Sequence, residues 1–185
     1  STNGTTMTMT SIGSNSGGSN GAEWAKWSLR THQTRGNRLL HLGTTHTNLF
    51  CLIAYSHMLG SSPLWSRVFV GAVVAKIYTS GDLLPSVIET IILVGMLVMS
   101  KDAGGWVLLL VNCVSFALEV AGHHVFNDPD IDAGESPMEM LVATIFVLCV
   151  SPFVFLKIHL HEYLGYHPKE WLEIQRKFSK SSSKD

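Results

Sequence analysis

Five apolar segments, each near the length of a membrane-spanning helix, dominate the middle of this 185-residue chain. A helix needs roughly 20 apolar residues to cross the hydrocarbon core of a bilayer. Short linkers rich in Gly, Ser, Pro and Asp separate the segments, as expected of turns. A soluble domain of this size rarely contains such runs. The sequence therefore predicts an all-α fold, a polytopic membrane helical bundle with four to five apolar helices, over residues 39–59, 63–79, 83–99, 106–126 and 138–163.

The two ends of the chain differ sharply from this middle. Residues 1–22 contain 18 Ser, Thr, Gly or Asn residues, which cannot bury enough apolar surface to order themselves. We expect a flexible polar leader at 1–22, a membrane helical domain at 23–166 and a polar, basic tail at 167–185. The amphipathic stretch 23–30 is predicted to lie at a membrane interface. The three cysteines lie in apolar runs without paired spacing, which predicts buried free thiols: Cys51, Cys113 and Cys149.

The charges limit both the partners and the topology. Lys and Arg number 13 against 14 Asp and Glu, so no basic excess suggests a nucleic-acid partner. Basic residues flank both the first apolar segment and the last. If basic flanks stay cytoplasmic, both termini are cytoplasmic and the number of crossings is even. Four crossings satisfy this best, with the second segment or half of the fifth re-entrant; translocation of one basic flank is the alternative.

Nine histidines carry the chemical signal. Ionisable groups at membrane depth are expensive and usually face the interior of a bundle, and imidazole is a ligand for iron, zinc, copper and nickel. The histidines lie near the start of the first segment and the ends of the fourth and fifth, where they could meet. A Glu119–His123 spacing of four lets the carboxylate orient the imidazole. The alternative is that histidines near helix ends are simply solvated. Nucleotide-binding loops, zinc-protease motifs and nucleophile elbows are absent.

Three blocks of sequence resemble a known family. The segment from His32 to Gly43, with Asn37, Arg38 and His41, resembles the HxxxxNRxxHxxG signature of the small endoplasmic-reticulum 2-hydroxy-fatty-acid (2-hydroxy-palmitate) dioxygenases. Residues 121–126, with His123 and Phe126, resemble the family's GHxxFE motif. Residues 151–154 and 164–166 are similar to its closing Ala-Pro-Phe and Leu-Gly-Tyr stretches. The blocks keep their order and spacing over roughly residues 30–167.

The resemblance implies an Fe(II)-dependent enzyme of the endoplasmic reticulum membrane that uses O2 and a lipid-like substrate. It would oxidise a long-chain 2-hydroxy fatty acid to CO2 and the acid one carbon shorter, without 2-oxoglutarate or a nicotinamide. Asn37 would orient a ligand or the substrate, and Arg38 would pair with the substrate carboxylate. The expected metal ligands are His32, His41 and His123, with a further position open to His124, His159 or His161.

The sequence departs from the family pattern at two positions. Asn127, followed by Asp128, stands where the family has Glu after GHxxF, and Lys157 stands where it has Glu after the Pro-Phe block. These departures leave other functions open. One is a divergent, metal-free member that isomerises, cyclises or binds a lipid-like substrate. Another is a histidine-lined membrane transporter of protons or a divalent metal.

Overall fold

A computed structural model describes residues 25, 28–29, 31–59, 64–128, 137–166 and 172. The predicted leader at 1–22 and all of the predicted tail except Leu172 lie outside the described residues. The elements are α2 (Arg35–Leu59), α3 (Leu64–Tyr78), α4 (Leu83–Met99), the short 3-10 helix η2 (Ser100–Asp102), α5 (Gly105–Phe126) and α6 (Pro137–Leu164). The described residues contain no strand, so the predicted all-α class is confirmed.

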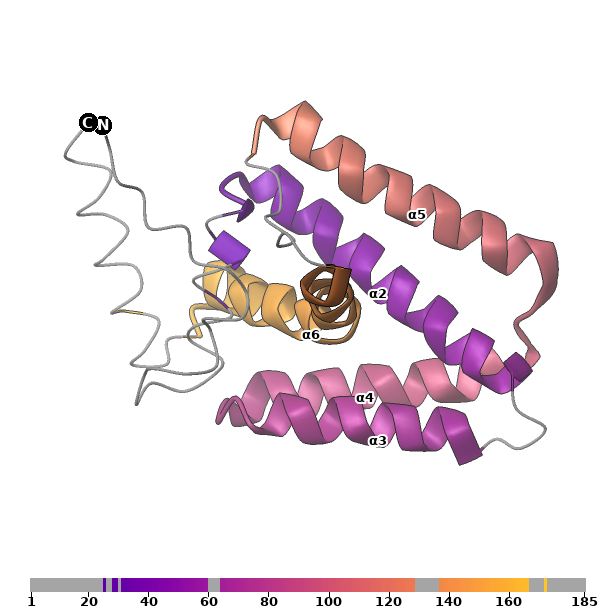
Figure 1. Ribbon diagram of the computed structural model, residues 1–185. Coiled ribbons are helices and arrows are strands. Elements are labelled where there is room, and N and C mark those ends of the chain that lie inside the picture. The colour runs from indigo at the N-terminus through magenta and orange to yellow at the C-terminus, as the bar shows by residue number, and fades with distance from the viewer. Residues whose placement is uncertain are drawn as a thin grey trace.

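Helix α2 lies at the centre of the bundle. In Figure 1, α5 runs along one side of α2, while α3, α4 and α6 lie on the other. This position explains why the most polar of the apolar segments forms a stable helix. Its polar side chains, among them Asn37, Thr45 and Asn48, are buried against neighbouring helices and not against lipid.

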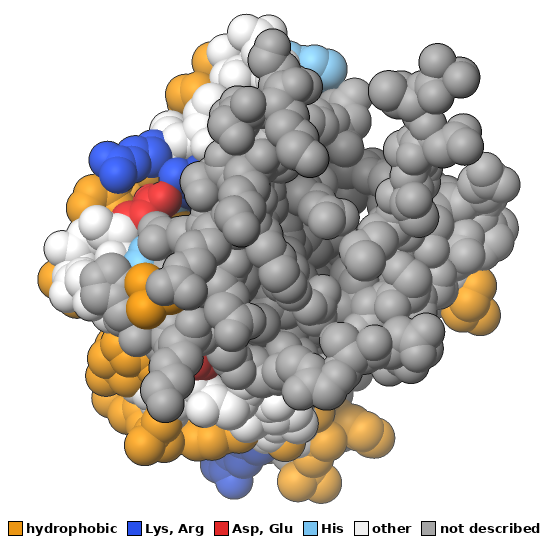
Figure 2. All heavy atoms as spheres, turned by 90° about the vertical axis from the view of Figure 1, so that its left-hand side faces the viewer, with side chains coloured by type: hydrophobic (Ala, Val, Ile, Leu, Met, Phe, Trp, Pro, Cys, Tyr) orange, Lys and Arg blue, Asp and Glu red, His pale blue; other side chains and the backbone are white. Residues whose placement is uncertain are grey.

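Three of the described helical segments are long and apolar enough to cross a membrane: Leu83–Asp102, Gly105–Phe126 and Val147–Leu164. The prediction of four to five spans is not confirmed, because α2 is too polar and the 15-residue α3 too short for this class. The outer faces of α4 and α5 expose large apolar side chains such as Ile91, Val98 and Leu110. Figure 2 shows hydrophobic side chains along the edge of the molecule at the end where α2 begins.

The last half of α6 fills the space between α2 and the α3–α4 pair. Phe153, Val154 and Ile158 are buried there and join one hydrophobic core with residues of α2, α3 and α4. Pro152 lies inside α6 and cannot donate a helical hydrogen bond. The first part of α6 is seen nearly end-on in Figure 1, whereas its last part runs across the view. The buried half carries Phe155 and Glu162 to the start of α2.

Ala25, from the stretch predicted to lie at a membrane interface, is fully buried and belongs to the hydrophobic core, so this position faces the bundle. One expectation needs correction. The three cysteines are free, but only Cys51 is buried, because Cys113 lies on the exposed side of α5 and Cys149 is half-buried.

Candidate metal centre

Three histidines from separate parts of the sequence meet at the end of the bundle where α2 begins. His32 precedes α2, His41 lies in its second turn, and His123 lies in the last turn of α5. One ring nitrogen of each lies within 4.8 Å of the others, and all three residues are buried. The ring centroids are 4.2 Å apart for His32 and His41, 4.8 Å for His32 and His123, and 5.1 Å for His41 and His123. This group, the histidine triad, could bind a metal ion.

The ring of His32 is oriented by its own local backbone. Its Nδ1 lies 3.0 Å from the carbonyl oxygen of Ser28 and 2.8 Å from Oγ1 of Thr31. A carbonyl oxygen only accepts, so Nδ1 carries the proton and Nε2 presents its lone pair, which is the arrangement of a metal-binding imidazole. Burial lowers the pKa of His32 to about 4, so the ring is neutral at physiological pH. A neutral ring is the form that binds a metal.

An aromatic side chain closes one side of the triad. The Phe155 ring from α6 contacts His32 edge-on, with centroids 4.9 Å apart, and stacks on His41 at 5.5 Å. Nε2 of His32 and of His41 has no hydrogen-bond partner among the described residues. Buried polar atoms are nearly always satisfied in native proteins, and a metal ion held by these nitrogens would satisfy both of them. Three imidazoles form a donor set that suits iron, zinc, copper or nickel.

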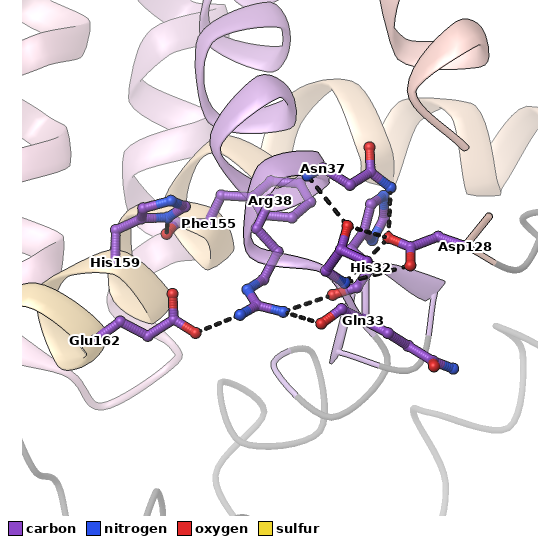
Figure 3. A network of polar contacts seen from close by, with 9 residues as sticks. His32, Gln33, Asn37, Arg38, Asp128, Phe155, His159 and Glu162 are labelled. Atoms are coloured by element: carbon purple, nitrogen blue, oxygen red, sulfur yellow. Dashed lines mark hydrogen bonds and ion pairs between the residues drawn. The ribbon is translucent and has the colours of Figure 1, made fainter. Parts of the chain in front are cut away.

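A carboxylate joins the start of α2 to the end of α5. Thr34 precedes α2, and its Oγ1 accepts a 3.3 Å hydrogen bond from the backbone N–H of Asn37, as an N-cap residue does. The side chain of Asp128, just beyond α5, accepts hydrogen bonds from Thr34 and from the amide of Asn37, the latter at 2.8 Å. Figure 3 shows Asp128 facing Asn37 at the start of α2. The amide nitrogen of Asn37 is therefore used to hold the start of α2 against the end of α5.

Arg38 ties the same region to α6. Its guanidinium donates to the carbonyl oxygens of His32 at 3.0 Å and Gln33 at 2.7 Å, and it forms a 2.5 Å ion pair with Glu162 (Figure 3). The predicted pairing of Arg38 with a substrate carboxylate would have to compete with Glu162. In the structure, Arg38 holds the backbone of a triad residue in place.

The other predicted site residues do not join the triad. His124 is exposed, as expected for a neighbour of the buried His123 about 100° around the helix. His159 and His161 are buried, but they are not part of the group whose ring nitrogens lie within 4.8 Å of one another. Their Nδ1 atoms lie 2.7 Å from the carbonyl oxygens of Phe155 and Tyr166. Glu119 accepts a 3.1 Å hydrogen bond from Asn48 and so links α5 to α2 one turn from His123.

The structure accounts for both departures from the family pattern. Asn127 is the C-cap of α5 in the left-handed conformation, with φ 53°, a role that Asn fills better than Glu. The next residue, Asp128, brings a buried carboxylate to this end of α5. Lys157 forms a buried ion pair with Asp82, the N-cap residue of α4. It lies two residues after Phe155, about 200° around an ideal helix, and so on the face of α6 away from the triad.

Sequence reasoning assigned no site role to three residues that shape this centre: Asp128, Phe155 and Glu162. Asp128 carried a usable signal, because it directly follows the position where the resemblance requires a carboxylate. Phe155 and Glu162 lie in an apolar segment and at its end, where an aromatic ring or a charge is ordinary. Only the approach of α6 to α2 reveals them.

A further polar pair lies elsewhere on α2, between the half-buried His46 and the buried Glu89. Nε2 of His46 is 3.1 Å from Oε2 of Glu89 on α4, and its Nδ1 lies 2.7 Å from the carbonyl oxygen of Leu42. His46 is five residues after His41 and points about 140° away from it. This pair therefore joins α2 to α4 and is separate from the triad.

Comparisons with known proteins identify no relative: no family, curated protein or solved structure matches this chain.

Proposed function

We propose that the protein is a membrane-embedded Fe(II)-dependent dioxygenase that shortens a long-chain 2-hydroxy fatty acid by one carbon. The observation that carries the proposal is the histidine triad, whose ring nitrogens lie within 4.8 Å of one another in a buried site. The resemblance of residues 30–167 to the 2-hydroxy-fatty-acid dioxygenases supplies the choice of iron and of substrate. It also suggests the endoplasmic reticulum membrane, with both termini cytoplasmic.

The triad would hold the metal through the three imidazoles of His32, His41 and His123. Three protein ligands leave coordination positions open, as catalytic metal sites require. Bound Fe(II) would supply the redox chemistry with O2 that histidine side chains lack. Imidazole also suits zinc and copper, so metal analysis is part of the test below.

The proposed overall reaction balances without a second reductant. The bond between the carboxyl carbon and the hydroxyl-bearing carbon breaks; the former leaves as CO2 and the latter becomes the new carboxyl carbon. This oxidation removes four electrons, which one O2 accepts, and one water forms besides the shortened acid. No nucleotide-binding motif is therefore needed in the chain.

The protein's own residues would bind and shield this chemistry. Phe155 packs on two triad rings and excludes water from that side. Asp128 and Arg38 hold the backbone around His32 and the start of α2. The exposed apolar faces of α4 and α5 would place the site beside lipid, from which a long acyl chain can enter.

The test compares purified variants in detergent. The wild-type protein, loaded with Fe(II) without O2, should retain about one iron per chain. After O2 and a long-chain 2-hydroxy acid are added, it should release CO2 and the shortened acid in equal amounts. His41→Ala and His123→Ala should each lose both iron and turnover. The matched control is His124→Ala, which removes the exposed neighbour of His123 and should keep both.

The outcomes separate the proposed function from its alternatives. If the wild-type protein binds no metal but holds a hydrophobic ligand, the dioxygenase proposal is refuted and the metal-free alternative is supported. Several loosely bound metals without O2 consumption would favour transport. If the protein binds one zinc per chain and consumes no O2, the metal site is supported but the oxygenase activity is refuted. Full iron content in His41→Ala would remove His41 from the ligand set.

A further inference from the structure

We infer that Asp128 is a positioning residue that sets the geometry of the histidine triad. This inference rests on the metal-binding part of the proposed function. Asp128 is 7% exposed and lies at the junction between the end of α5 and the start of α2. Figure 3 shows it beside Asn37 and His32.

Asp128 forms hydrogen bonds at or close in sequence to all three triad residues. Its backbone N–H donates a 3.0 Å hydrogen bond to the carbonyl oxygen of His123. Its carboxylate accepts from Thr34, through the backbone N–H at 3.3 Å and the hydroxyl at 3.2 Å, two residues after His32. It also accepts from the amide of Asn37 at 2.8 Å, four residues before His41. Asp128 thereby links the end of α5, through its backbone at His123, to the start of α2, through its side chain at Thr34 and Asn37.

The helices that Asp128 joins are already in close contact. A Cβ on Gly36 would lie 2.4 Å from Cε1 of Phe126, and one on Gly122 would lie 2.7 Å from Oδ1 of Asn37. These glycines let the backbones of α2 and α5 approach. Close packing prevents the helices from moving nearer, and the bonds of Asp128 prevent them from separating or sliding. The distance between His123 and the other two rings is therefore held from both sides.

The charge of Asp128 also suits a cation in the triad. A carboxylate at the start of a helix is stabilised by the helix dipole and by the free N–H groups there. The negative charge of Asp128 favours a positive charge in the neighbouring triad. Asp128 is not in the group of ligand atoms that converge, and its carboxylate bonds to Thr34 and Asn37, so it acts on the ligands through the backbone.

The experiment measures binding of Co(II) alone to the full-length protein in detergent, by its visible absorption and by titration. Asp128→Ala should raise the Kd for Co(II) about 10- to 100-fold and change the visible spectrum, since partners that orient metal ligands have effects of this size. Asp128→Asn keeps the volume but has one accepting oxygen instead of two, so its Kd should rise by less. The matched control Asp102→Ala removes an exposed carboxylate on η2 and should leave Kd and spectrum unchanged.

The free energy of unfolding of each apoprotein is measured in parallel. A purely structural role would lower that energy without changing the Kd or the spectrum of the folded protein, and this result would overturn the inference. If Asp128→Ala does not fold, Asp128→Asn decides: a Kd within about twofold of wild type refutes the positioning role. A wild-type protein that binds no Co(II) would instead refute the metal centre, and the inference would fall with it.

Discussion

Replacing Lys157 with methionine tests whether this residue, which stands where the resembled family has Glu, has a structural or a catalytic role. The ammonium of Lys157 pairs with the carboxylate of Asp82, and the two side chains are 1% and 6% exposed. The pair joins the buried half of α6 to Asp82, the N-cap residue of α4. It lies on the face of α6 opposite Phe155, which contacts the triad. We therefore expect Lys157→Met to reduce stability and to leave metal binding by the folded protein unchanged.

The expected loss follows from the burial of the pair. Removing one partner leaves a charge that water cannot reach, which typically costs about 3–5 kcal/mol. Methionine keeps most of the apolar stem of Lys157, so lost packing adds little. The double variant Lys157→Met with Asp82→Asn removes the stranded charge and should recover more than half of the loss. Asparagine is also a good N-cap residue, so the start of α4 should survive.

The assay is reversible unfolding in mixed detergent micelles, followed by far-UV circular dichroism, with metal content measured on each folded variant. Lys101→Met is the control, because Lys101 is exposed on η2 and should change stability by no more than about 0.5 kcal/mol. The reasoning is refuted if Lys157→Met stays within about 1 kcal/mol of wild type, or if the double variant loses the sum of the two single effects. If a fully folded Lys157→Met variant loses its metal, Lys157 contributes to the metal site after all.

Two further predictions concern the triad. Gly122→Ala should lower the free energy of unfolding by about 1–3 kcal/mol and weaken Co(II) binding, because the new methyl group would lie 2.7 Å from Oδ1 of Asn37. Gly95→Ala on α4, with nothing within 4 Å of its Cβ, should be neutral or slightly stabilising; equal effects would contradict this account. Burial lowers the pKa of His32 to about 4 in the folded protein. As the pH falls below about 6.5, the His32 imidazole is therefore protonated in the unfolded apoprotein before it is protonated in the folded one. Stability should therefore decline between about pH 6.5 and 4, by up to about 3 kcal/mol from this residue. His32→Gln should show a shallower decline in the same unfolding series, and identical slopes would refute the assignment.

The sequence alone determined the helices and most of their ends. The apolar segment predicted at 83–99 is α4, and those predicted at 63–79, 106–126 and 138–163 match α3, α5 and α6 within one residue at each end. Such boundaries depend on turn residues and on hydrophobic runs, which act over a few positions and can be read locally. The first helix begins four residues earlier than predicted, at Arg35, because Thr34 caps it. The opposite exposure of His123 and His124 also follows from helical geometry alone.

Only the tertiary structure decided which side chains meet. Composition and spacing alone left many groupings of the nine histidines open. The family resemblance selected His32, His41 and His123, and the structure brings these three together because α2 and α5 pack closely at Gly36 and Gly122. The partner of Lys157 lies 75 residues away in the sequence, and the partner of Arg38 lies 124 away. No local pattern encodes such pairs, since they depend on how whole helices cross. For the same reason, the polar segment 39–59, which was predicted to be a span, is the buried centre of the bundle. There, neighbouring helices provide hydrogen-bond partners that lipid could not offer to its polar side chains.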